Sequence, residues 1–183
     1  MKQTIDQVEV QGKRVLMRVD FNVPMKEGVI MDDRRIQMAI PSIQSVLSRG
    51  GTLTLISHLG RPTGNGFEQE FSLVPVSKRL SELLDQEVIC SDDDLSSTII
   101  LKENLRFHKG EKEDNQSFAN TIASGCDIYC NDAFGTAHRS HASNVGILEY
   151  VDEISYGYLM NNEIKYLKNH LKTSPSPIMF IIG

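Results

Sequence analysis

The sequence has no tryptophan and only three cysteines among its 183 residues. Cys90, Cys126 and Cys130 are an odd number of thiols without the paired close spacings of a zinc site, so neither a disulfide framework nor a metal site is expected. We expect reduced thiols in the core, where free cysteine is most often found. No apolar run approaches the roughly 18 residues of a membrane span, and the first residues carry no signal-peptide segment. These absences predict a cytoplasmic protein that does not bind a membrane.

Two motifs that hold nucleotide phosphates are also missing, namely GxxxxGK[ST] and a GxGxxG that follows a strand. Positive charge is scarce as well, because 19 Lys and Arg face 24 Asp and Glu, for a net charge of -5. A general nucleic-acid binder needs a broad basic surface, so we expect no nucleic-acid partner. Cations that gather locally in such an acidic chain are expected to be site residues.

Short apolar runs with little alternation predict parallel strands that are covered on both faces, at 15–19, 53–56, 88–90, 99–101 and 127–130. Segments with helical periodicity lie between several of them, with Ser72 and Asp114 as expected amino-terminal caps. This alternation predicts an α/β fold, a three-layer αβα sandwich around a Rossmann-like parallel sheet with helices on both faces. A last helix is expected over 158–171. A proline-rich linker and an apolar run at 178–182 follow, which is typical of the first strand of a second unit.

Polar and cationic side chains follow four of the predicted strands, in the segments 18–24 (RVDFNVP), 57–62 (SHLGRP), 103–108 (ENLRFH) and 131–143 (NDAFGTAHRSHAS). In an open α/β sheet, ligands bind outside the carboxyl ends of the strands. Arginine suits phosphate and carboxylate because its planar fork donates two parallel hydrogen bonds. The four segments therefore predict a pocket for a small, strongly anionic molecule.

Each segment also has an ordinary structural explanation. His58 and Arg61 could belong to a surface turn, and the cluster 138–141 could be a solvated loop or, less readily, a metal site. Asp20 and Asn22 are as consistent with an Asx turn as with the orientation of a substrate hydroxyl.

Two other charged features favour structural roles. Arg18 lies within a predicted strand, which favours an ion pair in the fold. The run 109–113 is most simply a solvated charge run.

Taken together, the four segments resemble the phosphoglycerate kinase family. Its patterns RVDFNVP, SHLGRP, ENLRFH and NDAFGTAHRxHAS occur in that order between Arg18 and Ser143. The chain is also similar to the family at the helix containing GYLM, 157–160, and at 181–183, which resembles the start of its ILGGAK strand. The resemblance implies a phosphoglycerate-binding amino-terminal domain at 1–155 and an interdomain helix at 156–173. It also implies a nucleotide-binding domain that is truncated after its first strand, 174–183.

The family transfers the acyl phosphate of 1,3-bisphosphoglycerate to ADP, reversibly, and gives 3-phosphoglycerate and MgATP. The resemblance thus implies the amino-terminal half of a glycolytic phosphotransferase with a carboxyl acceptor. It implies that Mg-ATP or Mg-ADP is bound by the missing domain of the full-length enzyme, which is monomeric in the family. No cofactor or metal is expected in this half.

The resemblance also implies roles for individual residues. Arg61, Arg106 and Arg139 would hold the non-transferred phosphate, with His138 in support. Arg35 would be catalytic, because it reaches the transferred phosphoryl group and stabilises its charge. Asp20 would orient the substrate and would not act as a general base. The full expected substrate-binding set is Asp20, Phe21, Asn22, Arg35, His58, Leu59, Gly60, Arg61, Arg106, His138 and Arg139.

Two other functions stay open: a stand-alone binding module for phosphorylated small acids, and an interaction protein whose basic loops meet an acidic partner. The unaccompanied strand at 178–182 favours the kinase fragment over the first, and the net negative charge disfavours the second. We expect the fragment to bind 3-phosphoglycerate without turnover. The run 178–182 is expected to detach, to dock out of place or to pair between molecules.

Overall fold

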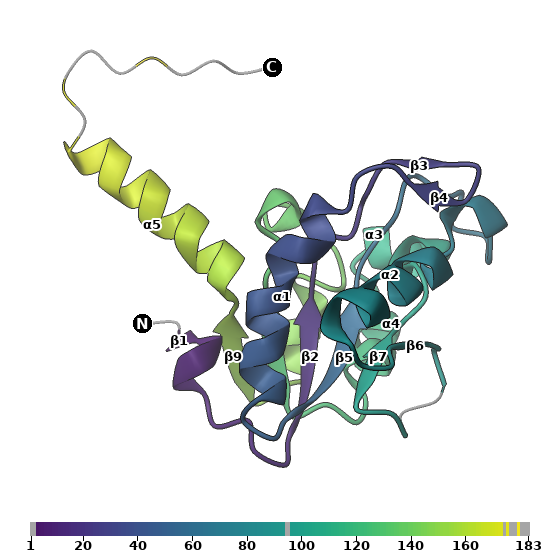
Figure 1. The fold of residues 1–183 in the computed structure, drawn as a ribbon, viewed down its shortest axis with the longest axis horizontal. Helices are drawn as coiled ribbons and strands as arrows, with labels where there is room; N and C mark the ends of the chain where they lie inside the picture. The colour runs from purple at the N-terminus through teal and green to yellow at the C-terminus, as the bar shows by residue number, and fades with distance from the viewer. Residues whose placement is uncertain (1–2, 94–95, 174, 176–178, 180–183) are drawn as a thin grey trace.

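A computed structural model describes residues 3–93 and 96–173, together with Pro175 and Met179. Its main sheet contains β1 (Gln3–Thr4), β2 (Arg14–Arg18), β5 (Thr52–Ile56), β6 (Ile89–Cys90), β7 (Ile99–Leu101), β8 (Ile128–Asn131) and β9 (Glu153–Tyr156). The strands are parallel and lie in the order β1, β9, β8, β2, β5, β7, β6 (Figure 1). The predicted parallel α/β sheet is confirmed.

The central strands are apolar on both faces, which explains why their sequences alternate so little. In β2, Val15 and Met17 pack into one buried cluster and Leu16 packs into the other. In β5, Leu55 joins the first cluster and Ile56 the second. A strand buried on both sides needs apolar residues at successive positions.

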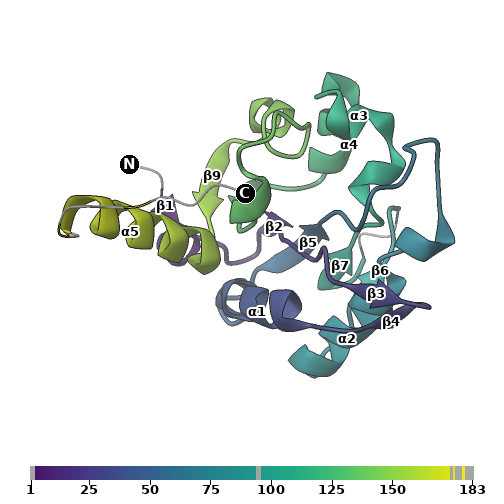
Figure 2. The same ribbon diagram turned by 90° about the horizontal axis from the view of Figure 1, so that it is seen from above.

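Helices cover both faces of the sheet (Figure 2). On one side, α1 (Arg34–Leu47) and α2 (Val74–Leu84) contribute Ile36, Ile43 and Leu80 to the first cluster. On the other side, α4 (Gln116–Ala123) and the short η5 (Gly146–Glu149) contribute Ile122 and Ile147 to the second. The three-layer arrangement expected from the sequence is therefore present.

The predicted cap of α4 is one residue off. Asn115, not Asp114, is the N-cap, and its side-chain oxygen accepts a hydrogen bond of 3.0 Å from the N–H of Phe118. Asp114 has a φ of 51° and accepts a hydrogen bond of 2.9 Å from the N–H of Gly146 instead. Ser72 does accept from the N–H of Val74, at 3.2 Å, although Leu73 is the N-cap of α2.

Several short elements had no clear signal in the sequence. Strands β1 and β9 extend the sheet on one side, and β3 (Met25–Lys26) and β4 (Val29–Ile30) form a separate hairpin. The turn of this hairpin, Glu27 and Gly28, has φ values of 51° and 78°, as a two-residue type I′ turn requires. The remaining short helices are η1 (Ile5–Gln7), η2 (Gln69–Phe71), η3 (Leu105–Phe107), α3 (Lys109–Lys112) and η4 (Phe134–Thr136).

The last helix, α5 (Tyr158–Thr173), begins against α1 and extends away from the body of the molecule (Figure 1). The N–H of Tyr158 donates a hydrogen bond of 2.9 Å to Oγ of Ser42 at its start. A helix is therefore present where 158–171 was expected, whereas the division into domains remains a prediction. The run 178–182 lies outside the described residues, Met179 excepted. Within the described residues, no helix is long and apolar enough to cross a membrane.

The three cysteines are free thiols, with Cys130 buried and Cys90 and Cys126 half-buried. Cys126 precedes β8, the strand that contains Cys130. Burial raises the pKa of the Cys90 thiol to about 12, so it stays protonated and unreactive at neutral pH.

Candidate anion-binding site

The strands of the sheet end together at one edge. Arg18, the last residue of β2, pairs in register with Ile56 of β5 on one side and with Asn131 of β8 on the other. Leu101, the last residue of β7, pairs with Leu55. The loops that follow these strands therefore start close together, which is how segments so far apart in sequence can build one site.

A cavity of about 620 Å³ opens at this edge. Five of the side chains that line it are arginine or lysine, and one is a carboxylate. The lining residues are Asp20, Asn22, Arg35, His58, Gly60, Arg61, Arg106, Lys112, Gly135, Thr136, Arg139 and His141. The structure thus brings together eight of the residues that the sequence pointed to, from all four motif segments and the start of α1.

Three of the expected residues lie elsewhere. Phe21 and Leu59 are buried in the apolar cluster beneath the site. His138 is exposed and does not line the cavity, whereas His141, three residues further on, does. The motif contains both histidines, and its sequence alone gives no reason to prefer the second.

Asp20 and Asn22 connect three parts of the site. Oδ2 of Asp20 accepts a hydrogen bond of 2.7 Å from Nη1 of Arg35, and its Oδ1 accepts one of 3.3 Å from the N–H of Asn22. The second bond is the Asx turn considered above. Asn22 in turn accepts a hydrogen bond of 2.8 Å from the N–H of Gly60. An Asx turn and a role in the site are therefore compatible, because the turn holds the side chains of Asp20 and Asn22 where they line the cavity.

Gly60 is required by its surroundings. Its φ is 60°, and a Cβ atom at this position would lie 2.5 Å from carbons of the Phe71 ring. Its carbonyl oxygen accepts a hydrogen bond of 2.8 Å from Nη1 of Arg106. The neighbour that excludes a side chain at this position is therefore the Phe71 ring.

His58 is a buried, neutral imidazole among cations. Burial, followed by the charges of Arg106 and Arg18, lowers the pKa of His58 to about 3. Its Nδ1 and the Nε of Arg106 are buried and have no hydrogen-bond partner among the described residues. An unsatisfied buried polar group costs about 1 to 3 kcal/mol, so these two atoms destabilise the site as it stands.

A buried ion pair lies behind the cavity. Arg18 and Glu111 have side-chain exposures of 1% and 0%, and Nη2 of Arg18 lies 3.9 Å from Oε1 of Glu111. Nε of Arg18 donates a hydrogen bond of 2.8 Å to Oγ of Ser143, and its Nη1 donates to Oγ1 of Thr136. The prediction that Arg18 is paired structurally is confirmed.

Glu111 holds the segment that carries His141. The N–H and Oγ of Ser143 donate to its two carboxylate oxygens at 3.0 and 2.7 Å, and Nδ1 of His141 lies 3.4 Å from Oε1. Burial opposes ionisation of Glu111, but His141, Ser143 and Arg18 outweigh it and hold the pKa of Glu111 below its usual value. The prediction that 109–113 is a solvated charge run is therefore wrong at Glu111. This residue is buried because the loop after β8 packs over it.

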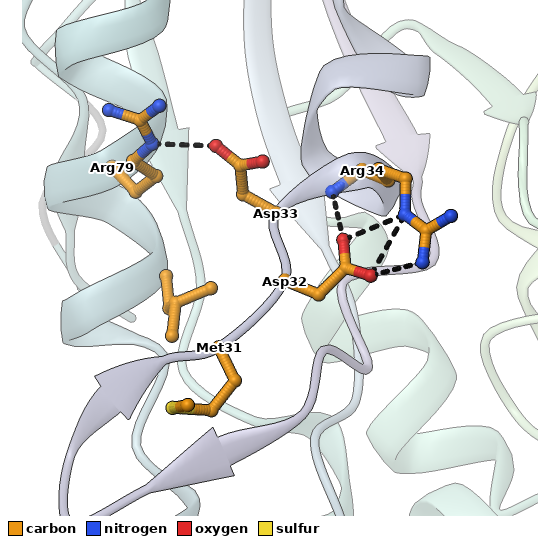
Figure 3. A pocket seen from close by; sticks show the side chains of 6 residues that line it. Met31, Asp32, Asp33, Arg34 and Arg79 are labelled. Carbon is orange, nitrogen blue, oxygen red and sulfur yellow. Dashed lines mark hydrogen bonds and ion pairs between the residues drawn. The ribbon is translucent and has the colours of Figure 1, made fainter.

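Another hollow, of about 440 Å³, lies beside the hairpin β3–β4 and the start of α1. Figure 3 shows its charged residues paired with one another: Nε of Arg79 donates to Asp33 at 2.8 Å, and the Arg34 guanidinium contacts Asp32. Since both of its cations are neutralised by its own carboxylates, it has no excess charge for an anion. The cavity at the strand ends is the better candidate.

A sequence model of the family described as "Phosphoglycerate kinase" matches residues 5–183. The chain belongs to the phosphoglycerate kinase family. It is 47% identical to the phosphoglycerate kinase of Chlorobium limicola and 48% identical to that of Rhodopirellula baltica, and both matches cover 100% of this chain. They cover 49% and 50% of those relatives, so the chain spans about half of their length.

Solved structures of the family show the same fold. Phosphoglycerate kinase from Coxiella burnetii superimposes with a TM-score of 0.89 at 38% identity, over 97% of this chain and 47% of that one. The enzyme from Pyrococcus horikoshii gives a TM-score of 0.82 at 29% identity, over 96% of this chain and 47% of its own. The sequence comparisons and the fold comparisons therefore agree that the chain belongs to the phosphoglycerate kinase family.

Proposed function

We propose that this chain forms the phosphoglycerate-binding half of a phosphoglycerate kinase. The enzyme would transfer the acyl phosphate of 1,3-bisphosphoglycerate to ADP, reversibly. The observation that carries the proposal is the cavity at the strand ends, where five cationic side chains and one carboxylate surround about 620 Å³. Its size is that of a small-molecule site, and its excess of positive charge suits a ligand with two anionic ends.

In this proposal the cationic residues divide between the ends of the substrate. Arg61, Arg106 and Arg139 bind the non-transferred phosphate, because guanidinium groups donate two parallel hydrogen bonds to phosphate oxygens. The position of Arg106 supports this role, since it lines the cavity and its Nη1 is fixed by a 2.8 Å hydrogen bond to the carbonyl of Gly60.

Asp20 and Asn22 would orient the glycerate hydroxyl, and Arg35 would stabilise charge on the transferred phosphoryl group. The 2.7 Å contact between Arg35 and Asp20 supports an orienting role for Asp20, because it holds the carboxylate in place beside the cationic side chains that line the cavity. Phosphoryl transfer depends mainly on positioning and electrostatic stabilisation, so a general base is not required.

The family uses a magnesium-bound nucleotide as its other substrate. Neither of the two common nucleotide-phosphate motifs occurs in this sequence. We therefore propose that these 183 residues bind phosphoglycerate but do not transfer phosphate by themselves. The cytoplasmic location, the monomeric state of the full-length enzyme and the absence of a nucleic-acid partner remain predictions.

Calorimetric titration with 3-phosphoglycerate, with and without ADP, tests the binding. Arg139→Lys keeps the charge but loses the fork, so affinity should fall by about 1 to 3 kcal/mol. Arg79→Lys is the matched control, because Arg79 lies in the other hollow and should leave affinity unchanged. Equal affinities of the wild type and Arg139→Lys would remove Arg139 from the site.

A coupled assay for ATP formation from 1,3-bisphosphoglycerate and ADP tests the lack of turnover. The protein must be free of kinase from the expression host. No activity above background is expected. Turnover that rises in proportion to the concentration of the chain would contradict the proposal.

A further inference from the structure

We propose that Lys112 is a further substrate-binding residue of the cavity, where its ammonium group contacts the phosphate of a phosphorylated carboxylic acid. The inference rests on the proposed function for the identity of the ligand. Lys112 belongs to none of the four motif segments, and it lines the cavity together with Arg61, Arg106 and Arg139. It is the contribution of α3 to that lining.

The backbone of α3 is fixed against the loop that carries Arg139 and His141. The carbonyl oxygen of Glu111 accepts a hydrogen bond of 2.9 Å from the N–H of Ala142. The buried carboxylate of Glu111 accepts two more from Ser143. Since Lys112 follows Glu111 directly, its Cα is held beside the segment from Arg139 to His141 whether or not a ligand is present.

The residues of α3 face two different spaces. Lys109, the first residue of α3, and Glu113, which follows the helix, line a neighbouring groove of about 960 Å³ that borders α4. Lys112 lines the cationic cavity and not that groove. This division means that the two lysines of one short helix should have different effects on anion binding.

The ammonium group of Lys112 is available to a ligand. Its side chain is exposed, and it takes part in no hydrogen bond or ion pair between residues in the described ranges. By contrast, Arg35 is paired with Asp20, and Arg106 donates to the carbonyl of Gly60. Lysine is a compact point charge on a flexible stem, so it can reach a phosphate without the fixed geometry that a guanidinium fork needs.

The test compares Lys112→Gln, Lys112→Arg and the control Lys109→Gln. Calorimetry with 3-phosphoglycerate and, separately, with inorganic phosphate measures their affinities. An exposed charge contact is worth a factor of up to about five. Lys112→Gln should therefore weaken both ligands by about two- to fivefold. Lys112→Arg should retain most of the affinity because it keeps the charge, and Lys109→Gln should match the wild type.

The outcomes separate this inference from the proposed function. If the wild type binds 3-phosphoglycerate and Lys112→Gln binds it equally well, Lys112 is not a binding residue and the proposed function stands. If the wild type binds inorganic phosphate but not 3-phosphoglycerate, the proposed function fails, and the phosphate titration still decides the role of Lys112. Binding of neither ligand by the wild type would overturn both. An equal loss in Lys109→Gln would reduce the effect to general surface charge and overturn the inference.

Discussion

Glu111→Gln should be one of the most destabilising substitutions of a charged residue in this chain. The carboxylate is completely buried and faces Arg18, whose side chain is 1% exposed. Glutamine has almost the same shape, so the change removes the negative charge with little effect on packing. It leaves the Arg18 guanidinium buried without its counter-charge.

The magnitude follows from the contacts that are lost. Breaking a buried ion pair by removing one partner costs about 3 to 5 kcal/mol, because the remaining charge is uncompensated. Ser143 donates two hydrogen bonds to the carboxylate, and the amide of glutamine can accept only one of them. These effects share the same groups and do not add, so we expect a total loss of about 3 to 5 kcal/mol. A domain is commonly stable by only about 5 to 15 kcal/mol.

Urea unfolding followed by circular dichroism at pH 7 measures the loss. Glu113→Gln is the matched control, since Glu113 follows α3 and is exposed, and its change should stay within about 0.5 kcal/mol. The pKa of Glu111 is lowered in the folded protein, so its contribution to stability is present above the ordinary glutamate pKa. It is lost as the pH falls through the lowered value. A loss in Glu111→Gln no larger than in Glu113→Gln would refute the importance of this buried pair.

Two further predictions concern the start of α5. Burial raises the pKa of Asp132 from 3.8 to about 6, so the folded state binds the proton more tightly than the unfolded state. The free energy of unfolding should therefore fall, relative to that of Asp132→Asn, by up to about 3 kcal/mol as the pH rises from about 4 to 6. Urea unfolding of both proteins across that range measures this difference. A difference that stays constant with pH would contradict the prediction. In Gly157→Ala, the new Cβ would lie 2.2 Å from Cγ of Asp132, so unfolding should require about 1 to 3 kcal/mol less free energy. An unchanged melting temperature would show that the backbone at Gly157 moves aside without cost.

Several features of the fold and the site could be read from the sequence because they depend on local pattern. Apolar runs such as Leu53–Ile56 and the helical segments between them predict a parallel sheet, and a parallel sheet places its strand ends at one edge. The convergence of Asp20, His58, Arg106 and Arg139 follows from that rule alone. Family membership followed from four long motifs in a fixed order.

Other features were decided by tertiary contacts between segments that are distant in sequence. Strands β1 and β9 contain no continuous apolar run that pattern could recognise, and they exist because they pair with each other and β9 pairs with β8. A charge run looks solvated in any single sequence, and Glu111 is buried only because the loop containing Ser143 packs over it. The same packing selects His141 over His138 and brings Lys112 to the cavity. Burial and the partner of a charge are properties of the assembled chain, since both depend on which distant residues exclude water from a side chain.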